Sequence, residues 1–262
     1  MPERFDLETF RRRHFDWRPG HHAAFFGPTG QAGKTTTAFQ LLDVIASPEI
    51  PATVLVMKHR DKNVAKWTRE LGFRETPSWP PVRKFSEVRA LGGTPPRGWT
   101  LWPPQTLTDV DADNARLSAE FTKAITHNRA HTPSITFADE IYGLIAELNL
   151  RKLLTAVVTR DSIAGHSLFY ASQKPSGTQG VSIPGFFFSS AEHIFLSRDG
   201  EERNRVRYGE IACGINPAEI ERQTLKLDAY SWLYIRRSSS RPAERSGPEW
   251  AIVDAYDERL AA

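Results

Sequence analysis

Residues 27–36 read Gly-Pro-Thr-Gly-Gln-Ala-Gly-Lys-Thr-Thr, a glycine-rich run that ends in a lysine and two threonines. Small residues let successive backbone N–H groups turn toward one phosphate, and a following helix would add its positive N-terminal end. In such a loop Lys34 would neutralise the β- and γ-phosphates, and the Thr35 hydroxyl would ligate Mg²⁺. The run therefore predicts a site for nucleotide phosphates. Its expected contact residues are Gly30, Gln31, Ala32, Gly33, Lys34, Thr35 and Thr36.

This run matches the P-loop pattern G-x-x-x-x-G-K-[ST] at its end, Gly33-Lys34-Thr35. Five positions before Gly33 the sequence has Pro28, and the nearest glycine, Gly27, stands one position earlier. Either Pro28 opens the loop, or the loop is one residue longer than the pattern. Both possibilities leave the phosphate-contacting part of the loop intact.

A second motif is the apolar run Ser134–Ala138, which is followed by Asp139 and Glu140 and has the form of a Walker B element. Asp139 would hold Mg²⁺ through its water shell, and Glu140 would orient and polarise the attacking water. The same two acids could instead cap the next helix and occupy its first turn. The upstream P-loop favours the catalytic interpretation, and a carboxylate pair indicates hydrolysis rather than transfer to a second substrate.

Hydrophobic patterning predicts the elements that position these motifs. A buried strand over 23–26 and a helix over 35–46 flank the glycine-rich run, and a β-branched strand over 53–57 precedes a helix over 61–71. This alternation is typical of a parallel sheet covered on both faces. Further helices are expected over 113–128 and 150–158, and further strands over 134–138, 167–171, 193–196, 229–235 and 250–256.

The predicted class is therefore α/β with a β-rich C-terminal end. We expect a single ATPase domain over 1–262 and a C-terminal β-hairpin over 229–256. Seven prolines between Thr76 and Gln105 exclude a regular helix or a central strand there. Residues 74–108 are accordingly expected to form an irregular insertion, rich in proline and tryptophan.

The expected strand over 167–171 is followed by Gln173-Lys174-Pro175-Ser176 and preceded by Gly165. The carboxyl end of a parallel strand lies at the edge of the sheet where ligands bind. A glutamine amide there can contact the γ-phosphate or the attacking water. Gln173 could thus report whether ATP is intact.

Together these segments resemble the FtsK/HerA class of DNA-pumping ATPases, in which a glycine precedes an apolar strand ending in Gln-Arg-Pro or a similar string. Gln173-Lys174-Pro175 matches with lysine in place of arginine, and the order of Lys34, Asp139-Glu140 and Gln173 also matches. The resemblance covers residues 20–200 in outline. By length the chain is most similar to the genome-packaging ATPases of tailless, membrane-containing phages.

This resemblance implies a P-loop NTPase with a central, mostly parallel RecA/FtsK-like sheet, and ATP and Mg²⁺ as cofactors. It also implies a homo-oligomeric ring, usually hexameric, that threads double-stranded DNA, with capsid-vertex or membrane-associated portal proteins as further partners. Such rings take an arginine from the neighbouring subunit to offset charge in the transition state. Arg160 is the candidate, and the competing arginines near a predicted sheet edge are Arg203, Arg205 and Arg207.

Three segments could contact DNA phosphates. They are the arginines Arg236, Arg237, Arg241 and Arg245, the run Arg11-Arg12-Arg13, and the flexible loop over 174–180. Each could equally be a solvated charge run, and the sequence does not rank them.

Composition limits the function classes further. The chain has 262 residues, with 34 Lys and Arg against 31 Asp and Glu, a formal net charge of +3. This balance permits a polyanionic partner without requiring one, and a single cysteine excludes an intramolecular disulfide framework. Residues 1–20 are too charged for a signal peptide, and no apolar run reaches the roughly 20 residues of a membrane span. We therefore expect a cytoplasmic location, and the resemblance to phage packaging ATPases implies that this is the cytoplasm of a host cell, with association with the virion as the alternative.

The leading hypothesis is an ATP-driven DNA translocase that packages a viral genome. The alternatives are a nucleotide-gated switch and a phage assembly ATPase of the Zot type, neither of which translocates DNA. A Zot-type protein usually carries a membrane helix. A GTPase would show Asn-Lys-x-Asp, and in a metabolite kinase Glu140 beside Asp139 would be less expected.

Overall fold

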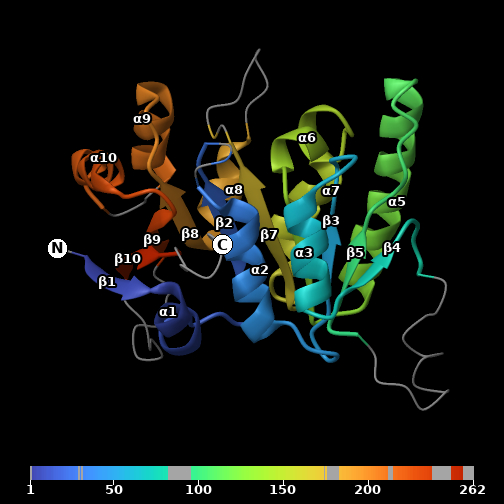
Figure 1. The fold of residues 1–262 in the computed structure, drawn as a ribbon, viewed down its shortest axis with the longest axis horizontal. Coiled ribbons are helices and arrows are strands. Elements are labelled where there is room, and N and C mark those ends of the chain that lie inside the picture. The colour runs from blue at the N-terminus through green and yellow to red at the C-terminus, as the bar shows by residue number, and fades with distance from the viewer. Residues whose placement is uncertain are drawn as a thin grey trace. The chain divides into compact units, whose positions relative to one another are not determined.

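The structure is a computed structural model that describes residues 2–28, 30, 32–81, 96–173, 175, 183–211, 215–237 and 249–255. Its residues form two compact units, whose elements are labelled in Figure 1. The first unit comprises Met1–Arg18, His22–Val44 and Ala171–Ala262, and the second comprises Pro19–His21 and Ile45–Tyr170. The expected single ATPase domain over 1–262 stays a prediction.

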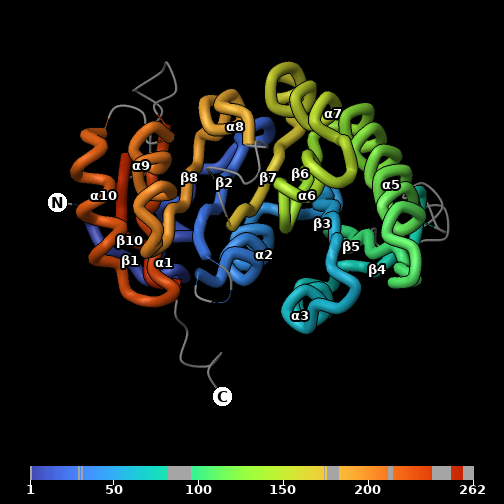
Figure 2. The backbone as a smooth tube through the Cα atoms, turned by 90° about the horizontal axis from the view of Figure 1, so that it is seen from above, coloured from blue at the N-terminus to red at the C-terminus, as the bar shows by residue number. Residues whose placement is uncertain are grey.

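The first unit contains a mixed sheet with strand order β1-β10-β9-β8-β2, in which β1–β10 and β8–β2 are parallel pairs. The strands β10–β9 and β9–β8 pair antiparallel. Figure 2 shows α2 on one face of β2 and β8 and α8 on the opposite face. The elements of this unit are β1 (Glu3–Asp6), α1 (Leu7–Arg13), β2 (His22–Phe26), α2 (Lys34–Ile45), α8 (Gly185–Ser190), β8 (Ala191–Ser197), α9 (Glu202–Ile211), α10 (Pro217–Lys226), β9 (Ser231–Arg236) and β10 (Trp250–Asp254).

Aromatic packing positions β2 and α2 in this unit. All five residues of β2 are buried, and the Phe25 ring stacks on Phe195 of β8 with a centroid distance of 4.8 Å. From β9, the Trp232 indole Nε1 donates a hydrogen bond of 3.0 Å to Thr37 Oγ1 in α2. The strand before the glycine-rich run and the helix after it are thus both anchored to the same aromatic core.

In the second unit the strand order is β7-β6-β3-β5-β4, and every pair is parallel. Figure 2 shows α3 on one face of these strands and α5 and α7 on the opposite face. The elements are β3 (Ala52–Leu55), α3 (Lys62–Glu70), β4 (Arg74–Thr76), β5 (Gly98–Leu101), α5 (Val110–Ala130), β6 (Ser134–Ala138), α6 (Ile141–Ala146), α7 (Arg151–Ala156), the π-helical turn η1 (Val157–Asp161) and β7 (His166–Ser172).

The predicted α/β class with mostly parallel strands and a β-rich C-terminal end is confirmed. Residues 74–108 differ from the expected irregular insertion, because β4 and β5 lie within them and join the parallel strands. The prolines of this region stand outside both strands, so they do not remove ladder hydrogen bonds. Residues 82–95 lie outside the described residues.

Helix ends also differ from the sequence prediction. The helix α5 starts earlier than expected because Asp109 caps it and accepts a hydrogen bond of 2.9 Å from Ala112 N. The helix expected over 150–158 divides into α7 and the π-helical turn η1. Among the described residues, none of the helices is long and apolar enough to cross a bilayer.

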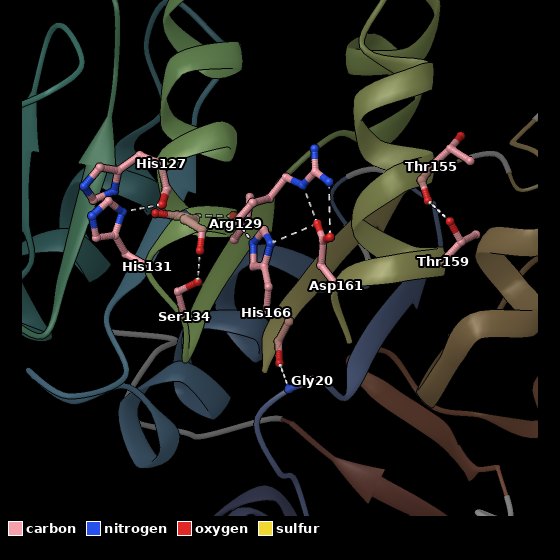
Figure 3. A network of polar contacts seen from close by, with 12 residues as sticks. Gly20, His127, Arg129, His131, Ser134, Thr155, Thr159, Asp161 and His166 are labelled. Carbon is pink, nitrogen blue, oxygen red and sulfur yellow. Dashed lines mark hydrogen bonds and ion pairs between the residues drawn. The ribbon is translucent and has the colours of Figure 1, made fainter. Parts of the chain in front are cut away.

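A buried histidine links η1 to the sheet of the second unit (Figure 3). His166 is fully buried, its Nε2 is hydrogen-bonded to Thr136 Oγ1 at 2.9 Å, and its Nδ1 lies 3.9 Å from Asp161 Oδ2. The Arg129 guanidinium binds Asp161 through two contacts of 2.5 and 3.2 Å. Burial lowers the pKa of His166 to about 4. The negative charge of Asp161 raises this pKa, but less than burial lowers it, and the positive charge of Arg129 lowers it further.

We expect acid to destabilise the fold through this histidine. The unfolded chain takes up a proton at His166 near pH 6.5, whereas the folded chain does so only near pH 4. The contribution of His166 to the free energy of unfolding is therefore fully present above pH 6.5 and is lost as the pH falls toward 4. The free energy of unfolding should fall by about 2 kcal/mol between pH 7 and pH 5. Urea unfolding at a series of pH values measures this loss.

His166→Gln should flatten that pH profile by the same amount. His59→Gln, which alters an exposed histidine of the same unit outside this network, is the control and should leave the profile unchanged. A His166→Gln profile as steep as that of the wild type would contradict the assignment.

Candidate nucleotide-binding and hydrolysis site

The glycine-rich run forms the loop between β2 and α2 in the first unit. Because β2 ends at Phe26 and α2 begins at Lys34, this loop spans residues 27–33. Lys34 Nζ donates hydrogen bonds to the carbonyl oxygens of Gly27 at 2.6 Å and Pro28 at 3.1 Å. The ammonium group thus folds back over the start of the loop. Thr29 and the expected contact residue Gln31 lie outside the described residues.

Two glycines of the loop are required by its geometry. A Cβ on Gly27 would lie 1.9 Å from Ser197 Oγ at the end of β8, so no larger residue fits there. Gly33 has φ +67°, which L side chains rarely adopt, and a Cβ on it would approach the Tyr230 ring to 3.3 Å. Tyr230 was not anticipated as a neighbour of the loop, because nothing local in the sequence relates positions 33 and 230.

The last two residues of β7, Ala171 and Ser172, belong to the first unit and lie beside this loop. The Gly27 N–H group donates a hydrogen bond of 3.2 Å to the carbonyl oxygen of Ser172, the last residue of β7. Gln173 follows directly and is half-buried. Gln173 and the glycine-rich loop therefore lie together in the first unit.

Asp139 and Glu140 follow β6 in the second unit, and β6 has the predicted bounds. Its five residues are buried, Asp139 is 6% exposed, and Glu140 is half-buried. Glu140 stands at the N-cap of α6, but its side chain makes no capping hydrogen bond. Helix capping therefore does not explain why a glutamate stands at this position.

Sequence reasoning missed Lys58, which approaches the acidic pair. Its Nζ donates hydrogen bonds to Asp139 Oδ2 at 3.1 Å and to Asp61 Oδ2 at 3.0 Å. Burial alone would lower the pKa of Lys58, but attraction to Asp139 and the hydrogen bonds to Asp61 and Asp139 outweigh burial and raise it. A signal was present in the sequence, because Lys58 follows directly on the expected strand over 53–57, at a carboxyl end where parallel strands collect polar groups.

Among the candidate arginines, Arg160 is exposed in η1 and forms no ion pair or hydrogen bond with the described residues. Arg205 is paired with Glu221 at 3.3 Å. Arg207 pairs with Glu210, and its guanidinium carbon lies 4.9 Å from the centroid of the Phe188 ring. Arg203 is exposed in α9.

Several arginines of the segments expected to contact DNA are paired within the protein. Arg236, expected as a DNA contact, is buried and paired with Asp16 at 2.7 Å, and Arg237 donates to the carbonyl oxygens of Ser189 and Ile211. In the N-terminal run, Arg11 pairs with Asp43 and Glu8, Arg12 pairs with Glu8, and Arg13 is exposed. Arg241, Arg245 and all of the loop over 174–180 except Pro175 lie outside the described residues.

Other exposed cations border a surface groove of about 500 Å³ in the second unit. His59, Arg60 and Lys62 line it together with the half-buried indole of Trp102. Neither the two cations nor His59 forms an ion pair with a described residue. A second cavity, of about 1370 Å³, is lined by Pro51 and Pro133, which precede β3 and β6, and so lies at the opposite strand ends from Asp139.

No protein-family model and no curated protein matches the chain, but solved structures do. The genome packaging NTPase B204 from Sulfolobus turreted icosahedral virus 2, in complex with AMPPCP, matches with a TM-score of 0.55 at 12% identity, over 92% of this chain and 100% of B204. VirB4 of Thermoanaerobacter pseudethanolicus matches with a TM-score of 0.58 at 10% identity, over 85% of this chain and 90% of VirB4. The cytoplasmic domain of EssC matches with a TM-score of 0.50 at 11% identity, over 94% of this chain and 42% of that one.

These similarities are in the fold alone, which is an α/β fold with a large, mostly parallel sheet, as in P-loop NTPases such as B204 and VirB4. The fold that the three motifs predicted is therefore confirmed.

Proposed function

We propose that the chain is an ATP-hydrolysing motor that translocates double-stranded DNA, and that its task is to pump a viral genome into a capsid. The observation that carries the proposal is the loop over 27–33, which joins a buried strand to a helix and is covered by the Lys34 ammonium. The fold supports it, because the chain shares that fold with the genome packaging NTPase B204 bound to AMPPCP.

The acidic end of β6 fits a divalent cation. Mg²⁺ binds through one or two carboxylates together with phosphate oxygens and waters. Asp139 offers a buried carboxylate, and the Lys58 ammonium beside it shows that this carboxylate attracts positive charge. Asp139 and Thr35 would hold Mg²⁺, which when bound neutralises charge on the phosphate oxygens.

The remaining roles belong to side chains and backbone groups of the chain itself. The N–H groups of residues 30–36 would cradle the phosphates, and Lys34 would pair with the β- and γ-phosphates. Glu140 would orient and polarise the attacking water, and Gln173 would contact that water or the γ-phosphate. Arg160 of a neighbouring subunit would offset the charge that develops in the transition state.

The proposed assembly is a homo-oligomeric ring, a hexamer, around the duplex. Its support is that Arg160 is exposed without an ion-pair partner among the described residues and that Ile163, three residues later, is 98% exposed. A cation beside an exposed apolar side chain suits a surface that another subunit covers. Capsid-vertex or membrane-associated portal proteins would receive the ring.

For the DNA contact, the groove with Arg60 and Lys62 is the best-supported described surface. Arg60 and Lys62 form no ion pair with a described residue, although Asp61 and Glu75 also line the groove, and Trp102 adds an aromatic surface. Affinity that depends on such phosphate contacts falls steeply with salt, because the bound cations release counterions from DNA.

ATP hydrolysis measured with and without linear duplex DNA tests the proposed function. We expect duplex DNA to raise the rate per subunit several-fold, and the effect to weaken steeply between about 50 and about 200 mM salt. The rate per subunit should also rise with protein concentration, because a ring completes each site with Arg160. The double variant Arg60→Ala, Lys62→Ala should lose the stimulation and keep the basal rate, with Lys66→Ala on the same helix as control.

A preference for GTP, or indifference to DNA at every salt concentration, would contradict the motor. Hydrolysis without any DNA response would favour the nucleotide-gated switch or the Zot-type assembly ATPase.

A further inference from the structure

Lys58 reaches the acidic end of β6 from the neighbouring strand. The strands β3 and β6 pair in parallel, with Leu55 opposite Ala138. Three residues past that pair, Lys58 Nζ lies 3.1 Å from Asp139 Oδ2 and 3.0 Å from Asp61 Oδ2. One ammonium therefore bridges two carboxylates, and one of them is the proposed metal ligand.

Neighbouring groups hold the backbone that carries this ammonium. Trp102 Nε1 donates a hydrogen bond of 2.7 Å to Lys58 O, and Gln105 Nε2 donates one of 2.5 Å to Met57 O. The Met57 side chain packs on Gly143 of α6, where an added Cβ would come within 2.7 Å of it. The segment is thus anchored on two sides, and the approach of Nζ to the acidic pair is built into the fold.

The charges around Asp139 are arranged for competition. Its side chain is 5% exposed, and a buried carboxylate needs a counter-charge or hydrogen bonds, which Lys58 supplies. An ammonium and a metal ion repel each other, whether the carboxylate holds the ion directly or through its water shell, so the two compete for Asp139. The Asp61 side chain would keep Lys58 paired after displacement, because Lys58 already contacts it. Lys58 therefore keeps an ion-pair partner after the exchange.

We propose that Lys58 is an internal competitor of the metal ion: its ammonium occupies Asp139 in the nucleotide-free protein and withdraws toward Asp61 when a metal enters. The metal then binds poorly by itself and well together with nucleotide phosphates, whose oxygens supply the additional ligands. This inference rests on the proposed function, because it takes Asp139 as a metal ligand. Lys58 is a positioning residue that acts through Asp139.

Binding of Mn²⁺ to the full chain without nucleotide, followed by electron paramagnetic resonance of the free ion, tests this competition. Lys58→Gln should bind Mn²⁺ about fivefold tighter than the wild type, as expected when one partly exposed ion pair is removed. Lys58→Met, which also lacks the charge but keeps the aliphatic stem, should do the same. Lys58→Arg keeps the charge and should bind like the wild type.

The matched control is Lys62→Gln, which removes the same charge four positions along the chain from a residue that forms no ion pair with Asp139. Its Mn²⁺ affinity should remain that of the wild type. An equal gain in Lys62→Gln and Lys58→Gln would overturn the proposal, because it would reveal a general charge effect. Thermal melts by circular dichroism establish that each variant is folded.

Asp139→Asn separates this inference from the proposed function. In the Lys58→Gln background it should abolish the gain in Mn²⁺ affinity. If Lys58→Gln brings no gain while Asp139→Asn still weakens Mn²⁺ binding in the presence of ADP, the competition is refuted and the metal role of Asp139 stands. If Asp139→Asn leaves Mn²⁺ binding with ADP unchanged, the metal role fails and the competition fails with it.

Discussion

Replacing Lys34 with alanine is expected to reduce ATP hydrolysis about 1000-fold, a loss of about 4 kcal/mol of transition-state stabilisation. The lysine is the first residue of α2, and its Nζ lies 2.6 Å from Gly27 O and 3.1 Å from Pro28 O, over the loop that would hold the phosphates. Without the ammonium the β- and γ-phosphates lose their cation in that loop. Both nucleotide binding and hydrolysis should therefore fall.

Steady-state hydrolysis and the binding of a fluorescent ATP analogue measure the two effects of Lys34→Ala. The control Lys226→Ala removes an exposed lysine at the end of α10 and should match the wild type. Alanine has the highest helix propensity, so α2 should form and thermal melting should be little changed. Hydrolysis by Lys34→Ala at the wild-type rate would exclude the proposed phosphate loop.

Glu140→Gln is expected to leave nucleotide binding intact and to slow turnover by about 10²–10⁴-fold. The amide has nearly the shape of the carboxylate, so the half-buried position at the start of α6 stays filled. The amide cannot accept a proton from the attacking water or polarise it as a carboxylate does. The loss should therefore appear in kcat and not in the Kd for ATP.

Single-turnover hydrolysis and equilibrium binding separate the two quantities for Glu140→Gln. Glu147→Gln is the matched control, because Glu147 is an exposed acid at the other end of α6. If Glu140→Gln weakened binding and hydrolysis to the same degree, Glu140 would serve binding and the water-activating role would be wrong. Turnover at the wild-type rate would exclude that role outright.

The strands and helices nearest the motifs could be predicted from local patterns. The strand over 134–138 has the predicted bounds, and the strand and helix around the loop over 27–33 differ from prediction by one residue at their ends. These segments carry strong signals, because each strand is an apolar run that is buried along its whole length. The glycines mark the loop between the first of these strands and the helix that follows it. The roles assigned to Lys34, Glu140, Gln173 and Arg160 stay predictions.

Long-range pairing accounts for what the sequence analysis missed. Arg236 looked like part of a basic surface, but 220 positions away Asp16 takes it into a buried ion pair. The strand β5 was overlooked because flanking prolines dominate its region, although its four residues are buried and pair with β3. In both cases a partner that is remote in sequence, Asp16 for Arg236 and β3 for β5, determines the local structure.

The sequence by itself predicts a phosphate site over 27–36, because backbone donors and a lysine within ten consecutive residues can form an anion site through local geometry alone. It also determined the alternation of strands and helices that leads to an α/β fold. Only the tertiary structure decided that β3 lies beside β6 and that Lys58 therefore contacts Asp139, 81 positions away. Strand order depends on the packing free energy of all the strands and helices together, so no short segment encodes which charges meet at the edge of the sheet.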